Sequence, residues 1–382
     1  MRYTIVTETY PPEINGVALT VQGLEEGLRQ RGHAVALVRP RQPADEDAPP
    51  CPDTLLVRGG RLPRYPGLRF GLPAPQALRA HFARHAPDAI YVATEGPLGW
   101  SALRAARQLG IPAATGFHTR FDHYMDDYGM PWLRPTALRW MRRFHNGGDA
   151  TLVPTLELGQ WLEEQGFHHV RRLARAVDTR QFHPDFRDEA LRTQWNAHPE
   201  APVVLSVGRI AAEKNLELAV RSFRSLQRDR PQARMVWVGD GPERAALEAA
   251  HPDFIFAGMQ RGEALARHYA SADLFVFPSR SETFGNVTLE AMASGLTTVA
   301  FDSGAAREHL RSGLHGAAVG DDEAFVTAVC ALGAQPARWK AMGAAAHQAV
   351  QALQPAQVAA DFDVLLSRLA RQRRPHAHVV PA

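Results

Sequence analysis

Hydrophobic positions along the chain cluster into short runs, and amphipathic stretches separate one run from the next. The first run, YTIVTE, leads through the loop TYPPEINGVA into an amphipathic helix that reaches Leu28. A later helix, SALRAARQLG, ends at Gly110, and the strand IPAATGFHT follows it. Short strands rich in β-branched residues that alternate with helices are typical of parallel βαβ units. The first half of the chain is therefore predicted to form a doubly wound sheet.

The same alternation starts again in the second half of the chain. The strand APVVLSVGRI precedes the helix NLELAVRSFRSLQRDRP, which ends at Pro231, and the strands ARMVWVGDGP, PDFIFAG, ADLFVFPS and LTTVAFD continue the series. A length of 382 residues exceeds the usual size of one hydrophobic core. Two α/β domains are therefore predicted, over residues 1–180 and 181–355, followed by a helix and tail over residues 356–382.

Composition narrows the class of protein. Hydrophobic residues make up 45% of the chain and charged residues 22%, as in ordinary globular proteins, and the net charge of +3 does not indicate a nucleic-acid partner. The two cysteines, Cys51 and Cys330, lack metal-ligand spacing and fit a reducing cytoplasm. No run approaches the roughly 18 apolar residues of a spanning helix, so a soluble or at most peripheral protein of the cytoplasm is expected.

Arginines gather at two places in the N-terminal half of the chain. Two interpretations stay open, an ordinary solvated surface or a face that meets anionic lipid on the inner side of the plasma membrane. The arginines are Arg58, Arg61, Arg64 and Arg69, and then Arg134, Arg139, Arg142 and Arg143.

Two motifs in the second half carry charged residues directly after predicted strands. In VGRIAAEKN, Arg209 and Lys214 flank a turn that opens a helix, so both cations can converge on one anion such as a diphosphate. In SETFGNVTLEAMASG, Glu282 and Glu290 are separated by seven residues, and the loop between them opens another helix. Free N–H groups at a helix N-terminus bind phosphate or sugar oxygens, and Gly285 permits close backbone approach. Solvated helix starts are the structural alternative for both motifs.

These motifs resemble the family 4 retaining glycosyltransferases of the GT-B fold. The resemblance rests on TETYPPEINGVA, GRIAAEKNLE, VGDGPER and SADLFVFPSRSETFGNVTLEAMASG and spans nearly the whole chain. The stretches LPRYPGLRFGLP and HTRFDHYMDDYG resemble the glycolipid mannosyltransferase and sulfoquinovosyltransferase branch. The resemblance implies two Rossmann-like domains facing a cleft, with the acceptor on the N-terminal domain, the nucleotide sugar on the C-terminal domain, and the last helix packing back toward the N-terminal domain.

The resemblance also implies roles for individual residues. Arg209 and Lys214 would hold the donor diphosphate, Glu282 the sugar hydroxyls and Glu290 the ribose hydroxyls. His118, in TGFHTRFDHYMDDYG, would lie at the reacting face of the sugar, with Arg120, Asp122 and Tyr124 in the acceptor-side loop. The remaining donor contacts would come from Gly16, Gly239, Asp240, Gly258, Met259, Phe284, Gly285, Asn286 and Val287.

The predicted activity is that of a retaining hexosyltransferase that needs no cofactor. No Asp-x-Asp metal motif lies in the donor loop, so a metal-independent reaction is expected. The branch resemblance favours GDP-mannose as donor and a lipid-linked or carbohydrate acceptor, and UDP-hexoses remain the alternative. A non-catalytic nucleotide-sugar-binding protein and a sugar-nucleotide epimerase are the rivals from other classes. A hydride-transfer enzyme is disfavoured, because the first strand is not followed by G-x-G-x-x-G.

Overall fold

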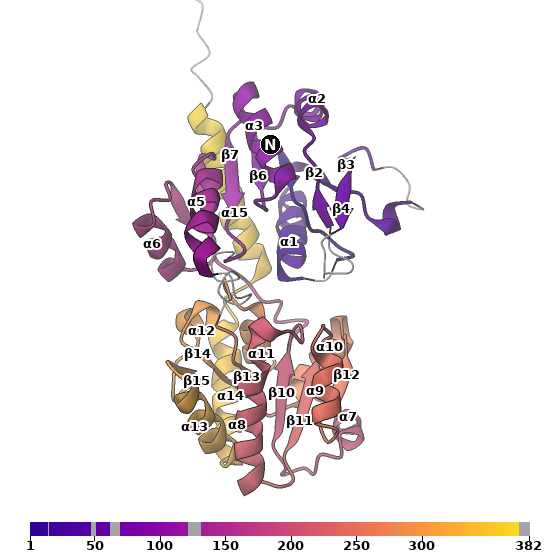
Figure 1. The fold of residues 1–382 in the computed structure, drawn as a ribbon, viewed down its shortest axis with the longest axis vertical. Coiled ribbons are helices and arrows are strands. Elements are labelled where there is room, and N and C mark those ends of the chain that lie inside the picture. Colours follow the sequence, from indigo (N-terminus) through magenta and orange to yellow (C-terminus); the bar gives the residue numbers. More distant parts are fainter. Residues whose placement is uncertain (14, 47–50, 62–68, 121–130, 281, 374–382) are drawn as a thin grey trace, which may run out of the picture. The chain divides into compact units, whose positions relative to one another are not determined.

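A sheet of seven parallel strands organises the first part of the chain (Figure 1). The computed structural model describes residues 1–13, 15–46, 51–61, 69–120, 131–280 and 282–373. The strand order is β3-β2-β1-β6-β7-β8-β9, so the order reverses between β1 and β6. Every residue of β6, β7 and β8 is buried, as expected for parallel strands covered on both faces. The strands are β1 (Arg2–Val6), β2 (Ala34–Pro40), β3 (Thr54–Val57), β6 (Ala89–Val92), β7 (Ala113–Gly116), β8 (Ala150–Val153) and β9 (Val170–Arg172).

Six α-helices pack with this sheet in the part of the chain that the structure describes. Two short strands, β4 (Gly59–Arg61) and β5 (Arg69–Gly71), pair antiparallel beside it. Within the described ranges, no helix combines the length and the apolar character that crossing a membrane requires. The helices are α1 (Gly16–Gln30), α2 (Pro75–His85), α3 (Pro97–Leu109), α5 (Arg134–His145), α6 (Leu156–Glu164) and α15 (Pro355–Arg373), and single 3₁₀ turns lie at η1 (Pro43–Asp45) and η2 (Pro131–Leu133).

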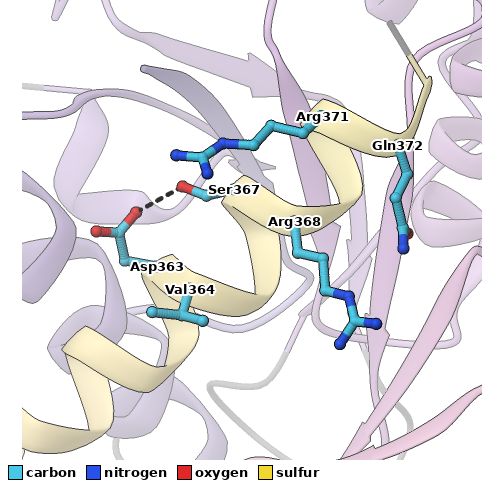
Figure 2. A pocket seen from close by; sticks show the side chains of 6 residues that line it. All are labelled: Asp363, Val364, Ser367, Arg368, Arg371 and Gln372. Atoms are coloured by element: carbon cyan, nitrogen blue, oxygen red, sulfur yellow. Dashed lines mark hydrogen bonds between the residues drawn. The ribbon is translucent and has the colours of Figure 1, made fainter.

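The last helix returns to the first sheet and is anchored there by a buried carboxylate. Helix α15 packs against α1 and β6, and Asp363 accepts hydrogen bonds from Tyr3 Oη at 3.1 Å and Arg31 Nε at 3.0 Å. Burial raises the pKa of Asp363, but hydrogen bonds from His33 and Arg31 outweigh it and hold that pKa below its ordinary value. Figure 2 shows Asp363 bonded to Ser367 at one end of a hollow along this helix. The packing of α15 confirms the prediction that the C-terminal helix returns to the N-terminal part of the chain.

A second sheet of six parallel strands follows, in the order β12-β11-β10-β13-β14-β15. Its strands are β10 (Val203–Val207), β11 (Arg234–Val238), β12 (Ile255–Gly258), β13 (Leu274–Phe277), β14 (Thr297–Phe301) and β15 (Gly316–Val319). Its helices are α7 (Glu189–Gln194), α8 (Leu216–Asp229), α9 (Arg244–Ala250), α10 (Gly262–Ser271), α11 (Asn286–Ala293), α12 (Gly304–His309), α13 (Asp322–Gly333) and α14 (Pro336–Val350), with 3₁₀ turns η3 (Pro184–Phe186) and η4 (Ala212–Lys214).

The described residues form two compact units. Those of Met1–Asp122, Trp132–Ala174 and Pro355–Ala382 form the first unit, and those of Arg175–Gln354 belong to the second. The sheet of each unit has its own buried apolar clusters on both faces. Independent domains with boundaries at residues 180 and 355 stay a prediction.

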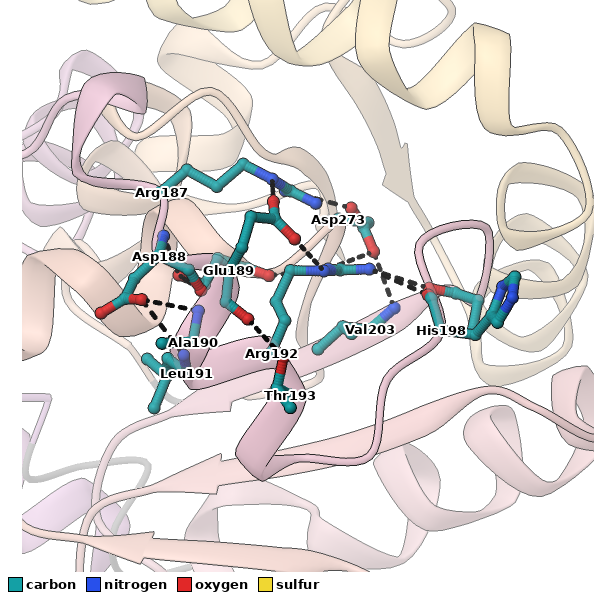
Figure 3. A network of polar contacts seen from close by, with 12 residues as sticks. Arg187, Asp188, Glu189, Ala190, Leu191, Arg192, Thr193, His198, Val203 and Asp273 are labelled. Carbon is teal, nitrogen blue, oxygen red and sulfur yellow. Dashed lines mark hydrogen bonds and ion pairs between the residues drawn. The ribbon is translucent and has the colours of Figure 1, made fainter.

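A buried ion pair ties together the amino ends of the two central strands of the second sheet (Figure 3). Arg192 on α7 is 1% exposed, and its Nη1 lies 3.0 Å from Asp273 Oδ2, directly before β13. The same carboxylate oxygen accepts the N–H of Val203, the first residue of β10, at 2.9 Å. Arg192 also donates to the carbonyl oxygens of Ser271 and Ala201. These contacts compensate the desolvation of both charges and fix where β10 and β13 begin.

We predict that Arg192→Met lowers the free energy of unfolding of the second unit by about 3 kcal/mol, because the buried Asp273 loses its buried cation and keeps only the partly exposed Arg187, whose Nη1 lies 3.4 Å from Asp273 Oδ1. Urea unfolding followed by circular dichroism measures the change. Arg221→Met is the matched control, since Arg221 on α8 pairs with Asp322 and Glu323 at an exposed surface and its loss should cost at most about 1 kcal/mol. Equal losses in the two variants would contradict the role given to Arg192.

Candidate active site

The predicted donor motifs lie at the point where the strand order of the second sheet reverses. Strands β10 and β13 are hydrogen-bonded neighbours, while β11 and β12 extend the sheet to one side and β14 and β15 to the other. Ligands of doubly wound sheets bind at the carboxyl ends of the strands at this reversal. The segment after β10 carries Arg209 and Lys214, and the segment after β13 carries Glu282.

Two cations and two carboxylates meet in these segments. Arg209 forms an ion pair with Glu213, and Lys214 forms one with Glu282, which also accepts a hydrogen bond from Ser279 Oγ at 3.2 Å. The Lys214–Glu282 pair joins residues 68 positions apart in the sequence. The structure therefore joins Lys214 to Glu282 and holds Arg209 beside Glu213, the neighbour of Lys214 in the sequence. Their shared role in donor binding stays a prediction.

The start of α11 presents backbone N–H groups beside this cluster. Gly285 is the N-cap residue, with φ at +85°, and it supplies no side chain to cap the helix. A residue with a Cβ is strained at this φ, so glycine suits the position. The first N–H groups of a helix, here those of Asn286 and Val287, have no intrahelical acceptor. Ser281, the first residue of the motif SETFGNVTLEAMASG, lies outside the described residues.

Phe284 and Asn286, on either side of Gly285, differ in their hydrogen bonding. Phe284 is buried, and its carbonyl oxygen accepts the N–H of Ala305 at 2.7 Å, so its role is to hold the loop against α12. Asn286 Oδ1 is buried and has no hydrogen-bond partner among the described residues. Buried polar atoms are almost always bonded, so this oxygen is suited to receive a hydroxyl or N–H of a ligand.

Glu290 lies on α11, four residues after Asn286 and on the same helix face. Its Oε2 accepts a hydrogen bond from Tyr269 Oη at 2.8 Å. Burial raises the pKa of Glu290 to about 7, and the hydrogen bond from Tyr269 opposes that rise. Tyr269 was not found from the sequence, because an aromatic residue in GEALARHYAS predicts a core position as readily as a site partner.

The turn after β11 contacts the Arg209 segment on one side and the end of β12 on the other. The N–H of Gly239 donates to the carbonyl oxygen of Gly258 at 2.9 Å, and the N–H of Ile210 donates to that of Asp240 at 3.0 Å. Met259 follows β12 and is 46% exposed. The four predicted nucleotide contacts, Gly239, Asp240, Gly258 and Met259, therefore border the same carboxyl edge of the sheet as Arg209.

The first unit holds the two other predicted site residues. Gly16 is the first residue of α1 and is exposed, and Asn15 caps this helix by accepting the N–H of Ala18 at 2.8 Å. Asn15 Nδ2 in turn donates to Thr9 Oγ1 at 2.6 Å, in the loop after β1. Asn15 and Gly16 therefore start a helix next to the loop that follows the central strand β1, and the predicted contact of Gly16 with the donor stays a prediction.

His118 lies two residues after β7 and is held by a tyrosine that sequence reasoning missed. His118 Nε2 lies 2.7 Å from the hydroxyl of Tyr91, a buried residue of β6. The ring of Tyr91 packs edge-on against Phe362 of α15, with centroids 5.0 Å apart. Asp122 and Tyr124, the other acceptor-side candidates, lie outside the described residues. Arg120 is described, and its guanidinium stacks 3.9 Å from the ring centroid of Trp161.

Two buried acids lie near the reversal point of the first sheet. Glu8 follows β1 and accepts the N–H of Leu98, at the start of α3, at 2.9 Å. Burial raises the pKa of Glu8 to about 7, while N–H groups of α3 and of Gly71 oppose the rise. Glu95 follows β6, and its Oε1 lies 3.2 Å from Nε2 of the buried His145. Among the described residues, no three His, Cys, Asp or Glu side chains gather as metal ligands do.

Comparisons with known proteins show which family the chain resembles. A family model described as Glycosyltransferase Family 4 matches residues 14–181, and one described as Glycosyl transferases group 1 matches residues 201–335. A GDP-mannose-dependent alpha-mannosyltransferase of Mycobacterium tuberculosis is 36% identical over 312 residues, 81% of each chain. The sulfoquinovosyl transferase SQD2 of Arabidopsis thaliana is 33% identical over 297 residues, 76% of this chain and 57% of that protein.

The fold is also found among solved structures. Sucrose-phosphate synthase from Thermosynechococcus elongatus superposes with a TM-score of 0.80 over 97% of this chain and 99% of that one, at 21% identity. This match and the two parallel sheets confirm the predicted fold class, a GT-B arrangement of two Rossmann-like sheets.

The contact between Tyr91 and His118 depends on a glycine, which gives a testable prediction. A Cβ at Gly116 would lie 2.1 Å from Tyr91 Oη and 2.6 Å from His118 Nε2. Gly116→Ala should therefore separate the two side chains, and overpacking should cost about 1–3 kcal/mol of stability. The ¹⁵N chemical shifts of the His118 ring measure the contact, and Tyr91→Phe should change them in the same way.

Gly23→Ala is the control, because a Cβ at Gly23 meets no atom within 4 Å. Its His118 shifts should equal those of the parent protein. Unchanged His118 shifts in Gly116→Ala would show that the hydroxyl of Tyr91 does not fix this ring.

Proposed function

Because the chain belongs to the family 4 glycosyltransferases, we propose that it transfers mannose from GDP-mannose, with retention of configuration, to a hydroxyl of a lipid-linked or carbohydrate acceptor. The observation that carries this proposal is the cluster of Arg209, Lys214 and Glu282 at the reversal of the second sheet. The mannosyltransferase name of the Mycobacterium tuberculosis relative supports the choice of sugar and nucleotide.

The donor site would bind each part of the nucleotide sugar by matched chemistry. The diphosphate carries negative charge that grows as the sugar leaves, and Arg209 and Lys214 neutralise it together with the N–H groups of α11. The diphosphate takes the place of Glu282 beside Lys214. Glu282 is then free to accept hydrogen bonds from sugar hydroxyls. Glu290 accepts from the ribose hydroxyls, and Gly239, Asp240, Gly258 and Met259 border the base.

The reaction we propose takes place on one face of the sugar. The bond between the anomeric carbon and the diphosphate oxygen breaks, the acceptor oxygen bonds to the anomeric carbon on the same face, and the acceptor proton passes to the departing phosphate. The cations stabilise the leaving group, so no side chain has to form a covalent intermediate. His118, held by Tyr91, orients the acceptor or a sugar hydroxyl at the reacting face. We further propose that the reaction needs no metal ion.

Two alternatives to GDP-mannose transfer are considered, a different donor sugar and a protein that binds the donor without turnover. The sulfoquinovosyl transferase from Arabidopsis thaliana shows that relatives at 33% identity carry names for another sugar, which keeps UDP-hexoses as alternative donors. A non-catalytic binding protein would keep the same donor site and show no turnover, so turnover of donor distinguishes it.

We predict that Lys214→Ala lowers turnover by about 10²–10³-fold, because one charge-stabilising donor in a transition state contributes about 2.7–4 kcal/mol. Release of GDP from GDP-mannose in the presence of acceptor measures it. Lys340→Ala, which changes an exposed lysine of α14, is the control and should keep full activity. Full activity in Lys214→Ala would rule out the proposed diphosphate site.

We propose that the first unit binds an anionic membrane surface and takes its acceptor from there. Trp132 is 69% exposed and Trp140 on α5 is 41% exposed. Arg139 and Arg143 on α5 are also exposed. Tryptophans and arginines on one short segment suit a membrane interface, where the rings enter the headgroup layer and the cations meet anionic lipids. Of the other arginine cluster, Arg64 lies outside the described residues, as does the tail after Arg373.

We predict that the protein sediments with vesicles of anionic phospholipid at low salt and is released at high salt. Replacing Arg139 and Arg143 by serine should weaken binding by about 2 kcal/mol, or roughly thirtyfold, at about 1 kcal/mol per cation. The matched control replaces Arg228 and Lys340, exposed cations of the second unit, and should bind like the parent. Absence of sedimentation at low salt would remove membrane association from the proposal.

A further inference from the structure

Tyr269 is a buried residue of α10 whose hydroxyl points at the donor site. Its side chain has no exposed surface, and its ring packs against those of Phe182 and Phe275, with centroids 5.6 and 5.8 Å away. Both rings belong to the apolar core of the second unit. The aromatic contacts fix the ring, so the hydroxyl occupies one position.

The hydroxyl of Tyr269 is hydrogen-bonded to one of the two carboxylate oxygens of Glu290. Tyr269 Oη donates to Glu290 Oε2 at 2.8 Å. Among the described residues, no other side chain is hydrogen-bonded to Glu290, so Oε1 stays available to a ligand. A carboxylate that is held at one oxygen cannot rotate away from the ligand side, and its remaining oxygen keeps a fixed direction.

We propose that Tyr269 is a positioning residue of the donor site, which holds Glu290 as an oriented carboxylate so that Glu290 can accept hydrogen bonds from a ribose diol. This inference rests on the proposed function, because it takes Glu290 as the group that binds the ribose. It adds that the affinity for the nucleotide depends on the charge of Glu290 and that the hydrogen bond from Tyr269 favours the charged form.

Other charged groups near α11 are bonded elsewhere. On α10, His268 Nδ1 lies 2.7 Å from the carbonyl oxygen of Ala264, and Arg267 pairs with Glu263. On α12, Arg307 pairs with Asp302, and His309 lies 3.9 Å from Glu308. On α14, His347 Nδ1 lies 2.6 Å from the carbonyl oxygen of Ala293, while Arg338 and Lys340 are exposed. Of the described titratable groups, Tyr269 alone forms a contact with Glu290.

The consequence for pH dependence follows from these contacts. Burial raises the pKa of Glu290 to about 7, so protonation in the neutral range would remove an acceptor from the diol. The hydroxyl of Tyr269 stabilises the carboxylate, and its loss should raise that pKa by about one unit. Affinity gained from the diol is present above the pKa and is lost as the pH falls through it. Tyr269→Phe should therefore move this loss to higher pH.

The test measures binding of GDP and of 2′,3′-dideoxy-GDP by isothermal titration calorimetry between pH 6 and pH 9. The two nucleotides carry the same base and phosphates, so the ratio of their dissociation constants isolates the diol. In the parent protein the preference for GDP should rise with pH through about 7. In Tyr269→Phe the preference at pH 7 should fall about fivefold and should nearly recover by pH 9. Glu290→Gln should show a preference that does not change with pH.

Tyr3→Phe is the matched control, because Tyr3 is a buried tyrosine that donates to a carboxylate of the first unit, Asp363. It should lose stability by a similar amount and keep the parent pH profile. A parent profile in Tyr269→Phe, whatever its melting temperature, would overturn the inference and leave the donor site standing. Equal affinity of the parent protein for both nucleotides at every pH, or no binding of GDP, would instead overturn the proposed role of Glu290.

Discussion

The parallel pairing of β10 with β13 is the constraint on which the donor site depends. Val204 pairs with Leu274 and Leu205 with Phe275, although the partners in each pair are 70 positions apart in the sequence. This register sets Lys214, after one strand, against Glu282, after the other. At the opposite edge of the sheet the buried pair of Arg192 and Asp273 fixes the amino ends of the same two strands. The same two strands therefore carry a buried ion pair at their amino ends and the site residues after their carboxyl ends.

Each cation of the proposed donor site has a carboxylate partner. Glu213 neutralises Arg209 and Glu282 neutralises Lys214, which limits the repulsion between the two cations. A bound diphosphate would replace carboxylate contacts rather than enter an unpaired cationic pocket. Glu213 is buried beside Arg209, so it orients the guanidinium, whereas Glu282 is partly exposed and can turn to sugar hydroxyls.

Much of this arrangement was predictable from the sequence. Alternating strands and helices predicted two doubly wound sheets, and the charged motifs after strands predicted Arg209, Lys214, Glu282 and Glu290 as site residues. The partners of these residues were not predictable. Glu213 in AAEKN has the pattern of a solvated helix start, and Tyr91 and Tyr269 have the pattern of core residues. Their roles depend on which side chains tertiary packing brings within 3 Å, and spacing along the chain does not contain that information.

The central claim is that the charged cluster of the second unit binds one nucleotide sugar, GDP-mannose, without a metal ion. Thermal unfolding in the presence of GDP-mannose, UDP-glucose, UDP-galactose, UDP-glucuronate or UDP-sulfoquinovose, each with and without EDTA, tests it most directly. We predict that GDP-mannose alone raises the unfolding temperature, with about 2.7 kcal/mol of stabilisation at one hundred times its dissociation constant, and that EDTA leaves the shift unchanged. No shift with any donor, a larger shift with a UDP-sugar, or loss of the GDP-mannose shift in EDTA would contradict the claim.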